Sequence, residues 1–167
     1  MSQFPSTTLE GREDSISVVF KEASPSQRLQ CRKLAAPPFG APLNESDYVQ
    51  LDEYLGDVPL TRDNGWRFWC LCLAGDRDQV LATCKTVHRS LFVREGDTAA
   101  ERQAYCIASV VTDPRYRGYG LASLLLEHVA EWMDGPGGAV ASLLYTSIKE
   151  VGKELLRGPV RFHVALT

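Results

Sequence analysis

The chain has 167 residues, of which 44% are hydrophobic and 23% are charged, values that are typical of one globular domain with its own core. A formal net charge of −3 argues against a nucleic-acid-binding surface, because such a surface needs clustered lysine and arginine. Every apolar run is shorter than the ~18 residues that a membrane span requires. We therefore expect neither a nucleic acid nor a membrane as a partner.

Residues 1–14 are polar and lack the apolar segment of a secretory signal. We interpret them as a disordered lead, and residues 15–167 as a single domain whose C-terminal strand or strands are incomplete.

The cysteines and histidines indicate no metal chemistry. The five cysteines are odd in number, form no Cys-x-x-Cys pair and lie mostly in apolar stretches, which is typical of reduced core residues in a cytoplasmic protein. The three histidines are far apart, so no metal site is expected.

The first predicted elements are a strand and a helix. Residues 15–20 (SISVVF) form a short apolar strand. A helix over 26–35 is predicted to follow, with Ser24 as its N-cap and Pro25 at its first position.

The next segments are a loop, a second helix and a second strand. The proline-rich residues 36–42 are predicted to form a stiff loop, and Ser46 to cap a helix that ends at Gly56. The strand Trp66–Leu73 follows the turn Asp63–Gly65, and its alternation places its even-numbered and odd-numbered residues on opposite faces.

The remaining peripheral elements complete an α/β order. A hairpin leads into a strand over 79–87, and the segment 94–102 is interpreted as a polar excursion. Near the end of the chain we expect a strand over 139–145, a short helix over 149–157 and a last strand over 160–166.

The central stretch of the chain has the order strand, glycine-rich turn, helix. Residues 103–112 form a buried strand, which Asp113 and Pro114 terminate because proline cannot donate to a ladder. From Leu121 onward, apolar residues recur at helical spacing.

This order is suited to binding an anion. A helix N-terminus leaves about four backbone N–H groups unpaired and carries roughly half a positive charge. Gly118 and Gly120 leave these donors accessible, Arg117 adds a cation, and the Ser123 hydroxyl can reach the same site. A diphosphate is the ligand that fits.

Two common nucleotide motifs are absent. No lysine follows Gly120, which argues against a Walker-type triphosphate site. Ser123 occupies the place of the third glycine of a dinucleotide-binding fingerprint, and that fingerprint assigns no role to Arg117.

The segment Arg117–Ala122 (RGYGLA) instead resembles the acetyl-CoA signature of the GNAT N-acetyltransferase superfamily. The resemblance implies an α/β fold with a mixed sheet of about six strands and flanking helices, one strand fewer than is usual in the family. Segments around 60–69, 82–86, 107–110 and 143–148 further resemble fungal lysine N6-acetyltransferase-like proteins. The likeness spans about residues 15–148.

The resemblance implies an enzyme that transfers an acetyl group from acetyl-CoA to a small amine, best matched by lysine, by direct attack in a ternary complex. The strands at 103–112 and 139–145 would separate to admit the pantetheine arm. The residues implied to bind acetyl-CoA are Val110, Val111, Thr112, Arg117, Gly118, Tyr119, Gly120, Leu121, Ala122 and Ser123.

The acid and base are less clearly indicated. Glu101 and Asp113 are the carboxylates nearest the central strand, and we take Glu101 as the candidate base, with a solvated loop charge as the alternative for each. Family members often carry a tyrosine acid on the helix after the fifth strand, where this chain has leucine. Tyr145 is our candidate for that role and Tyr105 is a second, with core packing as the alternative for both.

The acceptor region and the alternative functions follow from what remains. The second helical region is acidic, which suits a cationic amine, although solvated helix faces explain the same residues: Glu45, Asp47, Asp52, Glu53 and Asp57. A free edge on the last strand suggests a homodimer. A CoA-binding module without turnover, and a truncated or altered-frame product, stay open as alternatives.

Overall fold

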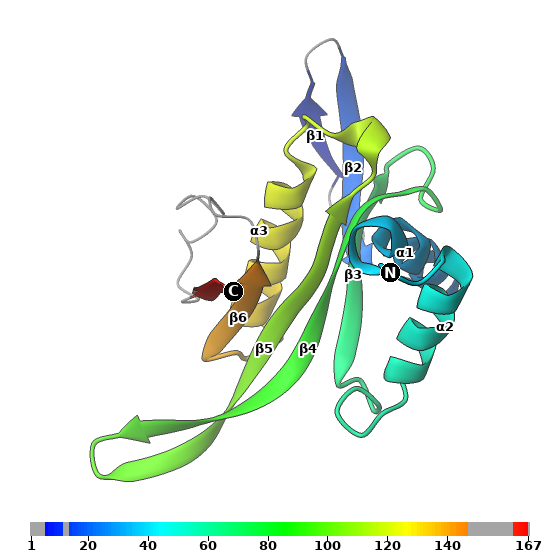
Figure 1. Cartoon of the computed structure of the whole chain (residues 1–167). Coiled ribbons are helices and arrows are strands. Elements are labelled where there is room, and N and C mark those ends of the chain that lie inside the picture. The colour runs from blue at the N-terminus through cyan, green and yellow to red at the C-terminus, as the bar shows by residue number, and fades with distance from the viewer. Residues whose placement is uncertain (1–5, 12–13, 147–161, 167) are drawn as a thin grey trace.

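The computed structural model describes residues 6–11, 14–146 and 162–166, and these form one mixed sheet flanked by helices (Figure 1). Seven described strands lie in the order in which they occur in the sequence. The elements are β1 (Ser6–Glu10), β2 (Ser15–Glu22), α1 (Pro25–Phe39), α2 (Glu45–Leu55), β3 (Trp66–Leu73), β4 (Val80–Glu95), β5 (Thr98–Thr112), the short 3-10 turn Pro114–Tyr116, α3 (Leu121–Asp134), β6 (Ala141–Thr146) and β7 (Phe162–Leu166).

The predicted mixed α/β sheet is confirmed. Neighbouring strands from β1 to β5 are antiparallel, whereas β5 with β6 and β6 with β7 are parallel pairs. β1 is added to the six strands that the sequence predicts.

The disordered lead predicted for residues 1–14 is wrong for Ser6–Glu10, which form β1. This strand pairs with β2 from Ser6 opposite Val19 to Glu10 opposite Ser15, and Leu9 packs against the main core. The sequence of β1 is polar and has no strand pattern of its own, so its strand conformation depends on its pairing with β2.

Helices cover both faces of the sheet (Figure 1). α3 packs against the odd-numbered side chains of β3, including Trp69 and Leu71, to form the main core. α1 packs against the even-numbered side chains, including Phe68 and Cys70. The predicted division of β3 is therefore confirmed, and we call the two sides the α3 face and the α1–α2 face.

Helix starts and ends differ from the prediction in detail. Ser24 caps α1 as predicted, in a capping box with Gln27. However, α1 continues through Pro37 and Pro38 to Phe39, where the sequence predicts a loop, because the two prolines fall in its last turn and Gly40 N still bonds to Ala36 O at 2.7 Å.

α2 begins before the predicted cap. Asn44 is its N-cap, and its side-chain oxygen accepts a hydrogen bond from Asp47 N at 2.9 Å. Asn44 precedes Ser46 and caps as well as serine does, so the helix starts earlier. Gly56 ends α2 as predicted.

The segment 94–102 is not an excursion but part of a long hairpin. β4 and β5 stay paired from Ala82 opposite Thr112 to Glu95 opposite Thr98, and Gly96, with a φ of 65°, supplies the left-handed conformation of the turn. The pairs of β3 with β4 end at Val87, so the hairpin projects beyond the sheet as an arm (Figure 1).

The C-terminal elements are only partly described. The helix predicted over 149–157 lies outside the described residues. The last strand is present as β7, parallel to β6.

Candidate functional site

The site begins where β5 separates from β6. Their parallel pairs run from Ala104 opposite Ala141 to Ile107 opposite Leu144 and then end, although β5 continues to Thr112. Two residues after the last pair, Ser109 has a φ of 53°, and the ladder with β4 shifts register at this point. A positive φ is uncommon for serine, so this bulge marks a position that the surroundings hold in place.

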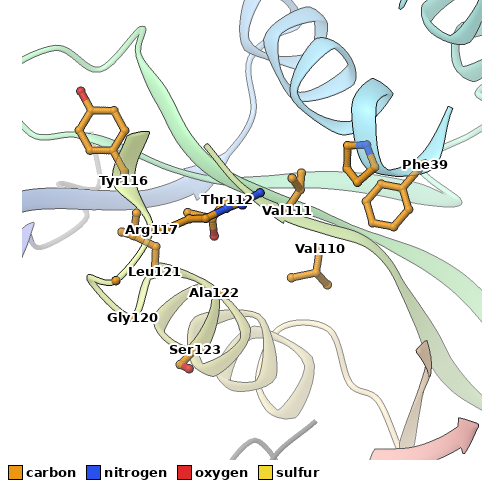
Figure 2. Close-up of a pocket in the computed structure, with 12 residues that line it drawn as sticks. Phe39, Val110, Val111, Thr112, Tyr116, Arg117, Gly120, Leu121, Ala122 and Ser123 are labelled. Carbon is orange, nitrogen blue, oxygen red and sulfur yellow. The ribbon is translucent and has the colours of Figure 1, made fainter. Parts of the chain in front are cut away.

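Beyond the bulge, β5 borders a cavity of about 520 Å³. Figure 2 shows its lining side chains, which come from the end of β5, the loop before α3, the start of α3 and the last residues of α1. The cavity is lined by Pro38, Phe39, Val110, Val111, Thr112, Tyr116, Arg117, Gly118, Gly120, Leu121, Ala122 and Ser123. It therefore brings together nine of the ten residues for which the sequence predicts coenzyme binding.

The backbone conformation of the loop, and not a lack of space, requires glycine at positions 118 and 120. Gly118 and Gly120 have φ values of 92° and 75°, and a Cβ built on either meets no atom within 4 Å. Gly120 is the N-cap of α3 and has no side chain to satisfy the first amides of the helix. The loop thus presents unpaired N–H groups and a positive helix end to open space, which is the arrangement that binds phosphate.

Tyr119 is the exception among the predicted coenzyme residues. Its side chain does not line the cavity, and its hydroxyl donates a hydrogen bond to the Asp14 carboxylate instead. Its ring lies against Gly11, where a Cβ would meet Tyr119 Cε1 at 2.2 Å.

The candidate base lies far from the cavity. Glu101 is exposed on the projecting arm, nine residues before Val110, which is about 30 Å along an extended strand. Its placement gives no support to a catalytic role. Asp113 accepts hydrogen bonds from Arg115 N at 2.9 Å and Arg115 Nη2 at 2.7 Å, and these contacts hold the pKa of its carboxyl below the usual range. The Asp113 carboxylate therefore already accepts hydrogen bonds from Arg115.

The two candidate tyrosines differ. Tyr105 is a core residue, because it packs edge to face against Trp132 and its hydroxyl donates to the Gly137 carbonyl at 3.2 Å. Tyr145 is the β6 residue that follows Leu144, the last one paired with β5. Its side chain lies outside the described part of the structure.

The α1–α2 face carries a charged cluster that was not predicted from the sequence and that consists of Arg32, Asp52 and Lys85. The Lys85 ammonium contacts one Asp52 carboxylate oxygen, and Arg32 Nε donates to the other at 3.0 Å. Asp52 is 4% exposed and Lys85 is 7% exposed. Burial lowers the pKa of Lys85, and the Asp52 carboxylate opposes this effect. The sequence signal was a single lysine inside the apolar strand 79–87.

Aromatic side chains complete this cluster and connect it to the bulge. Lys85 Nζ lies 5.0 Å from the ring centroid of Trp66 and 5.1 Å from that of Phe68. Lys85 pairs with Ala108 across the ladder, directly before the Ser109 bulge. Burial raises the pKa of Tyr48, with a further contribution from Asp52.

The acidic helical region is therefore less available than the sequence suggests. Asp52 is neutralised within the cluster, and Glu53 Oε1 lies 3.4 Å from Arg32 Nη1. Asp47 accepts a hydrogen bond from Asn44 at 2.8 Å. Of the five acidic residues, Asp52 is buried, and Glu45, Asp47, Glu53 and Asp57 are exposed.

The described part of the chain shows neither grouped metal ligands nor a membrane-spanning helix. Within residues 6–11, 14–146 and 162–166, no three or more His, Cys, Asp or Glu side chains are grouped so as to hold a metal ion. None of the helices that the structure describes is both long and apolar enough to cross a membrane.

Comparison with known proteins identifies the family. The sequence profile of the acetyltransferase (GNAT) family matches residues 28–150, which is more than half of the chain. The chain belongs to the GNAT acetyltransferase family. GNAT enzymes use acetyl-CoA and act on small-molecule or protein amines. The cavity therefore belongs to a protein whose family uses acetyl-CoA.

Solved structures share the GNAT fold with this chain. An acetyltransferase from Trypanosoma brucei is 20% identical, with a TM-score of 0.56, over 80% of this chain and 86% of that one. Glucosamine-6-phosphate N-acetyltransferase from Arabidopsis thaliana is 15% identical, with a TM-score of 0.55, over 79% and 84% of the two chains.

A third structure, a predicted acetyltransferase from Clostridium acetobutylicum with acetyl-CoA, is 15% identical, with a TM-score of 0.54, over 84% and 86% of the two chains. Among curated protein sequences, none matches this chain significantly. At these identities the likenesses show the fold alone.

Proposed function

We propose that the protein is an acetyl-CoA-dependent N-acetyltransferase that acts on the amine of a small molecule, with a lysine-like amine as the first acceptor to test. One observation supports this most strongly. A single cavity is bordered by the part of β5 that β6 does not pair and by the left-handed glycine loop at the start of α3.

The residues present fit the coenzyme. A diphosphate needs N–H donors and space at the start of a helix, and Gly118 and Gly120 leave open space where side chains would otherwise stand. The amides of Gly118–Ser123 and the Arg117 guanidinium would hold the diphosphate. The backbone of Val110–Thr112, which pairs only with β4 among the described strands, would hold the pantetheine arm as an added strand does.

The coenzyme supplies an activated acetyl group as a thioester. The amine nitrogen would bond to the acetyl carbon as the carbon–sulfur bond breaks. The amine loses one proton and the departing thiolate gains one, so the products are an amide and a thiol. A backbone N–H of β5 beside the Ser109 bulge would polarise the carbonyl, and one preorganised donor of this kind contributes about 10²–10³ in rate. Much of the remaining acceleration would come from holding the two substrates together.

Proton transfer is assigned to solvent and to Tyr145. The cavity-lining residues include no carboxylate, which favours loss of the amine proton to water. Tyr145 directly follows the last pair between β5 and β6, so its position in the chain supports it as the donor to the departing thiolate. We expect Tyr145→Phe to lower kcat while the Kd for CoA is unchanged.

The acceptor proposal depends on the sequence resemblance to fungal lysine N6-acetyltransferase-like proteins. The exposed Glu45, the first residue of α2, and Asp57, which follows α2, add negative charge that attracts a cationic amine. Because Asp52 and Glu53 are paired with cations, the acceptor region offers fewer free carboxylates than a polyamine would favour.

The deciding experiment measures thiol release from acetyl-CoA with free lysine and a panel of other amines, together with calorimetric CoA binding. The test variant is Gly120→Glu, which places a carboxylate in the open space beside the expected diphosphate. Gly96→Glu is the matched control, because Gly96 also has a positive φ and open space around it but lies at the tip of the arm. We expect turnover in the wild type and in Gly96→Glu, and loss of CoA binding in Gly120→Glu.

A second candidate is a coenzyme-binding module without turnover, which the lack of a carboxylate among the cavity-lining residues favours. Tight CoA binding by the wild type with no thiol release for any amine would support it. No CoA binding by the wild type would contradict both candidates.

A further inference from the structure

The glycine loop is held from outside by the N-terminal hairpin. Gly11 and Asp14 flank the connection between β1 and β2, and Gly11 N donates to Asp14 O at 2.6 Å. The Tyr119 ring packs on Gly11, and the Tyr119 hydroxyl donates to the Asp14 carboxylate. The contact joins residues 105 positions apart in the sequence.

Tyr119 stands between two cavity-lining glycines and faces the other way. Gly118 and Gly120 border the cavity, whereas the Tyr119 side chain extends to the hairpin. At Gly118 and Gly120 the loop thus presents backbone to the cavity, and Tyr119 between them places a large aromatic anchor on the opposite side.

The hairpin is a firm support for this anchor. β1 is paired along its five residues with β2, which is itself paired with β3 from Val18 opposite Leu73 to Glu22 opposite Trp69. Leu9 of β1 and Tyr119 both pack against the core that α3 and the sheet share. The anchor therefore connects the loop to the sheet and not to a free terminus.

We propose that Gly11 and Asp14, beside the ends of β1 and β2, support the coenzyme site from outside and that Tyr119 is a positioning residue, which fixes the glycine loop before the coenzyme binds. This inference rests on the proposed function. Two left-handed glycines give the loop many accessible conformations, and ordering them on binding costs affinity. Packing on Gly11 and the hydrogen bond to Asp14 select one conformation in advance.

The test compares Tyr119→Phe, Asp14→Asn, the double variant and Gly11→Ala in the full chain. Tyr119→Phe keeps the ring and removes only the hydroxyl, and Gly11→Ala puts a methyl group into the space of the ring. Tyr54→Phe is the control, because Tyr54 is 69% exposed on α2. The readouts are the calorimetric Kd for CoA and amide hydrogen exchange of residues 117–120 with and without CoA.

We expect each single change at Tyr119 or Asp14 to raise the Kd for CoA about fivefold. The double variant should be no worse than either single variant, because both changes break one interaction. Exchange at 117–120 should be faster in the free variants and return to the wild-type rate when CoA is saturating. A purely structural role would lower the unfolding midpoint without this exchange pattern confined to the loop.

The outcomes separate this inference from the proposed function. If the wild type binds CoA and the hairpin variants bind equally well with unchanged exchange, the inference is overturned while the proposed function stands. If the wild type does not bind CoA, the proposed function fails. In that case, faster loop exchange in Tyr119→Phe would still support the positioning contact, and unchanged exchange would overturn it.

Discussion

The two faces of the sheet build their polar features in opposite ways. Beside the N-terminus of α3, the glycine loop of the cavity depends on backbone conformation within one short segment, where Gly118 and Gly120 adopt left-handed φ values. On the α1–α2 face, the charged cluster of Arg32, Asp52 and Lys85 depends on side chains from α1, α2 and β4. The first feature is local in sequence and open to a ligand, and the second is assembled by the fold and buried.

This difference predicts which measurement each face will affect. Changing an exposed cavity-lining side chain of the loop, such as Arg117, should alter coenzyme affinity and leave folding stability nearly unchanged. Changes in the cluster should alter folding stability first, because buried charges that lose their partner are costly.

The largest expected effect is that of Asp52→Ala. This change leaves the buried Lys85 and the half-buried Arg32 without their shared carboxylate, so we expect the free energy of unfolding to fall by about 3–5 kcal/mol. Urea unfolding followed by circular dichroism would measure it. Glu53→Ala is the matched control, because Glu53 contacts Arg32 from the next position but is 56% exposed, and its loss should cost less than about 1 kcal/mol. Equal losses in the two variants would contradict the distinction.

The next effect is on binding. Arg117→Ala removes a cation that lines the cavity, and we expect the Kd for CoA to rise about tenfold, with a weaker dependence on salt. Arg115→Ala makes the same change of charge two residues earlier, where the guanidinium is bound to Asp113 and its side chain is 72% exposed. Calorimetry should show that Arg115→Ala binds nearly as the wild type does. A similar loss in both would mean that only net charge matters.

A smaller effect tests whether α1 is stabilised locally. Ser24→Ala removes the side-chain oxygen that accepts from Gln27 N at 3.4 Å, and half of the capping box with it. We expect a loss of about 1 kcal/mol in unfolding free energy, measured by urea denaturation, with CoA affinity unchanged. A change in affinity would show that α1 contributes to the cavity through more than Pro38 and Phe39.

The smallest effect is a pH dependence on the cavity side. The hydrogen bonds from Arg115 lower the pKa of Asp113 in the folded state, so this carboxylate stabilises the fold above the unfolded value of about 3.9 and stops doing so as the pH falls through its folded pKa. Asp113→Asn should cost less than about 1 kcal/mol near pH 6. The difference from the wild type should shrink toward pH 3, and a difference independent of pH would exclude this origin.

The comparison of the two faces also explains what the sequence could predict. The strand, glycine turn and amphipathic helix around the cavity have patterns that lie within about 30 residues, so their order was predicted. The resemblance to the GNAT signature then implied the nine lining residues. The cluster could not be predicted, because three residues from separate elements meet only after the sheet and helices pack.

Two further misses have the same origin. β1 has no apolar alternation of its own, and only its pairing with β2 makes it a strand. Tyr119 lies inside the recognised signature, yet its partner Asp14 is in the segment interpreted as disordered. In both cases the deciding contact joins segments that no local pattern connects.

The projecting arm has a consequence for the motions of the sheet. Between Val87 and Ala104 the two long strands have only each other as partners among the described strands, and an isolated two-stranded ribbon is marginally stable. The arm can therefore open from Gly96 inward without disturbing the rest of the sheet. Its amide protons would exchange fastest at the tip and progressively more slowly toward Ile107. The exchange rates along the hairpin would therefore measure how far it opens from its tip.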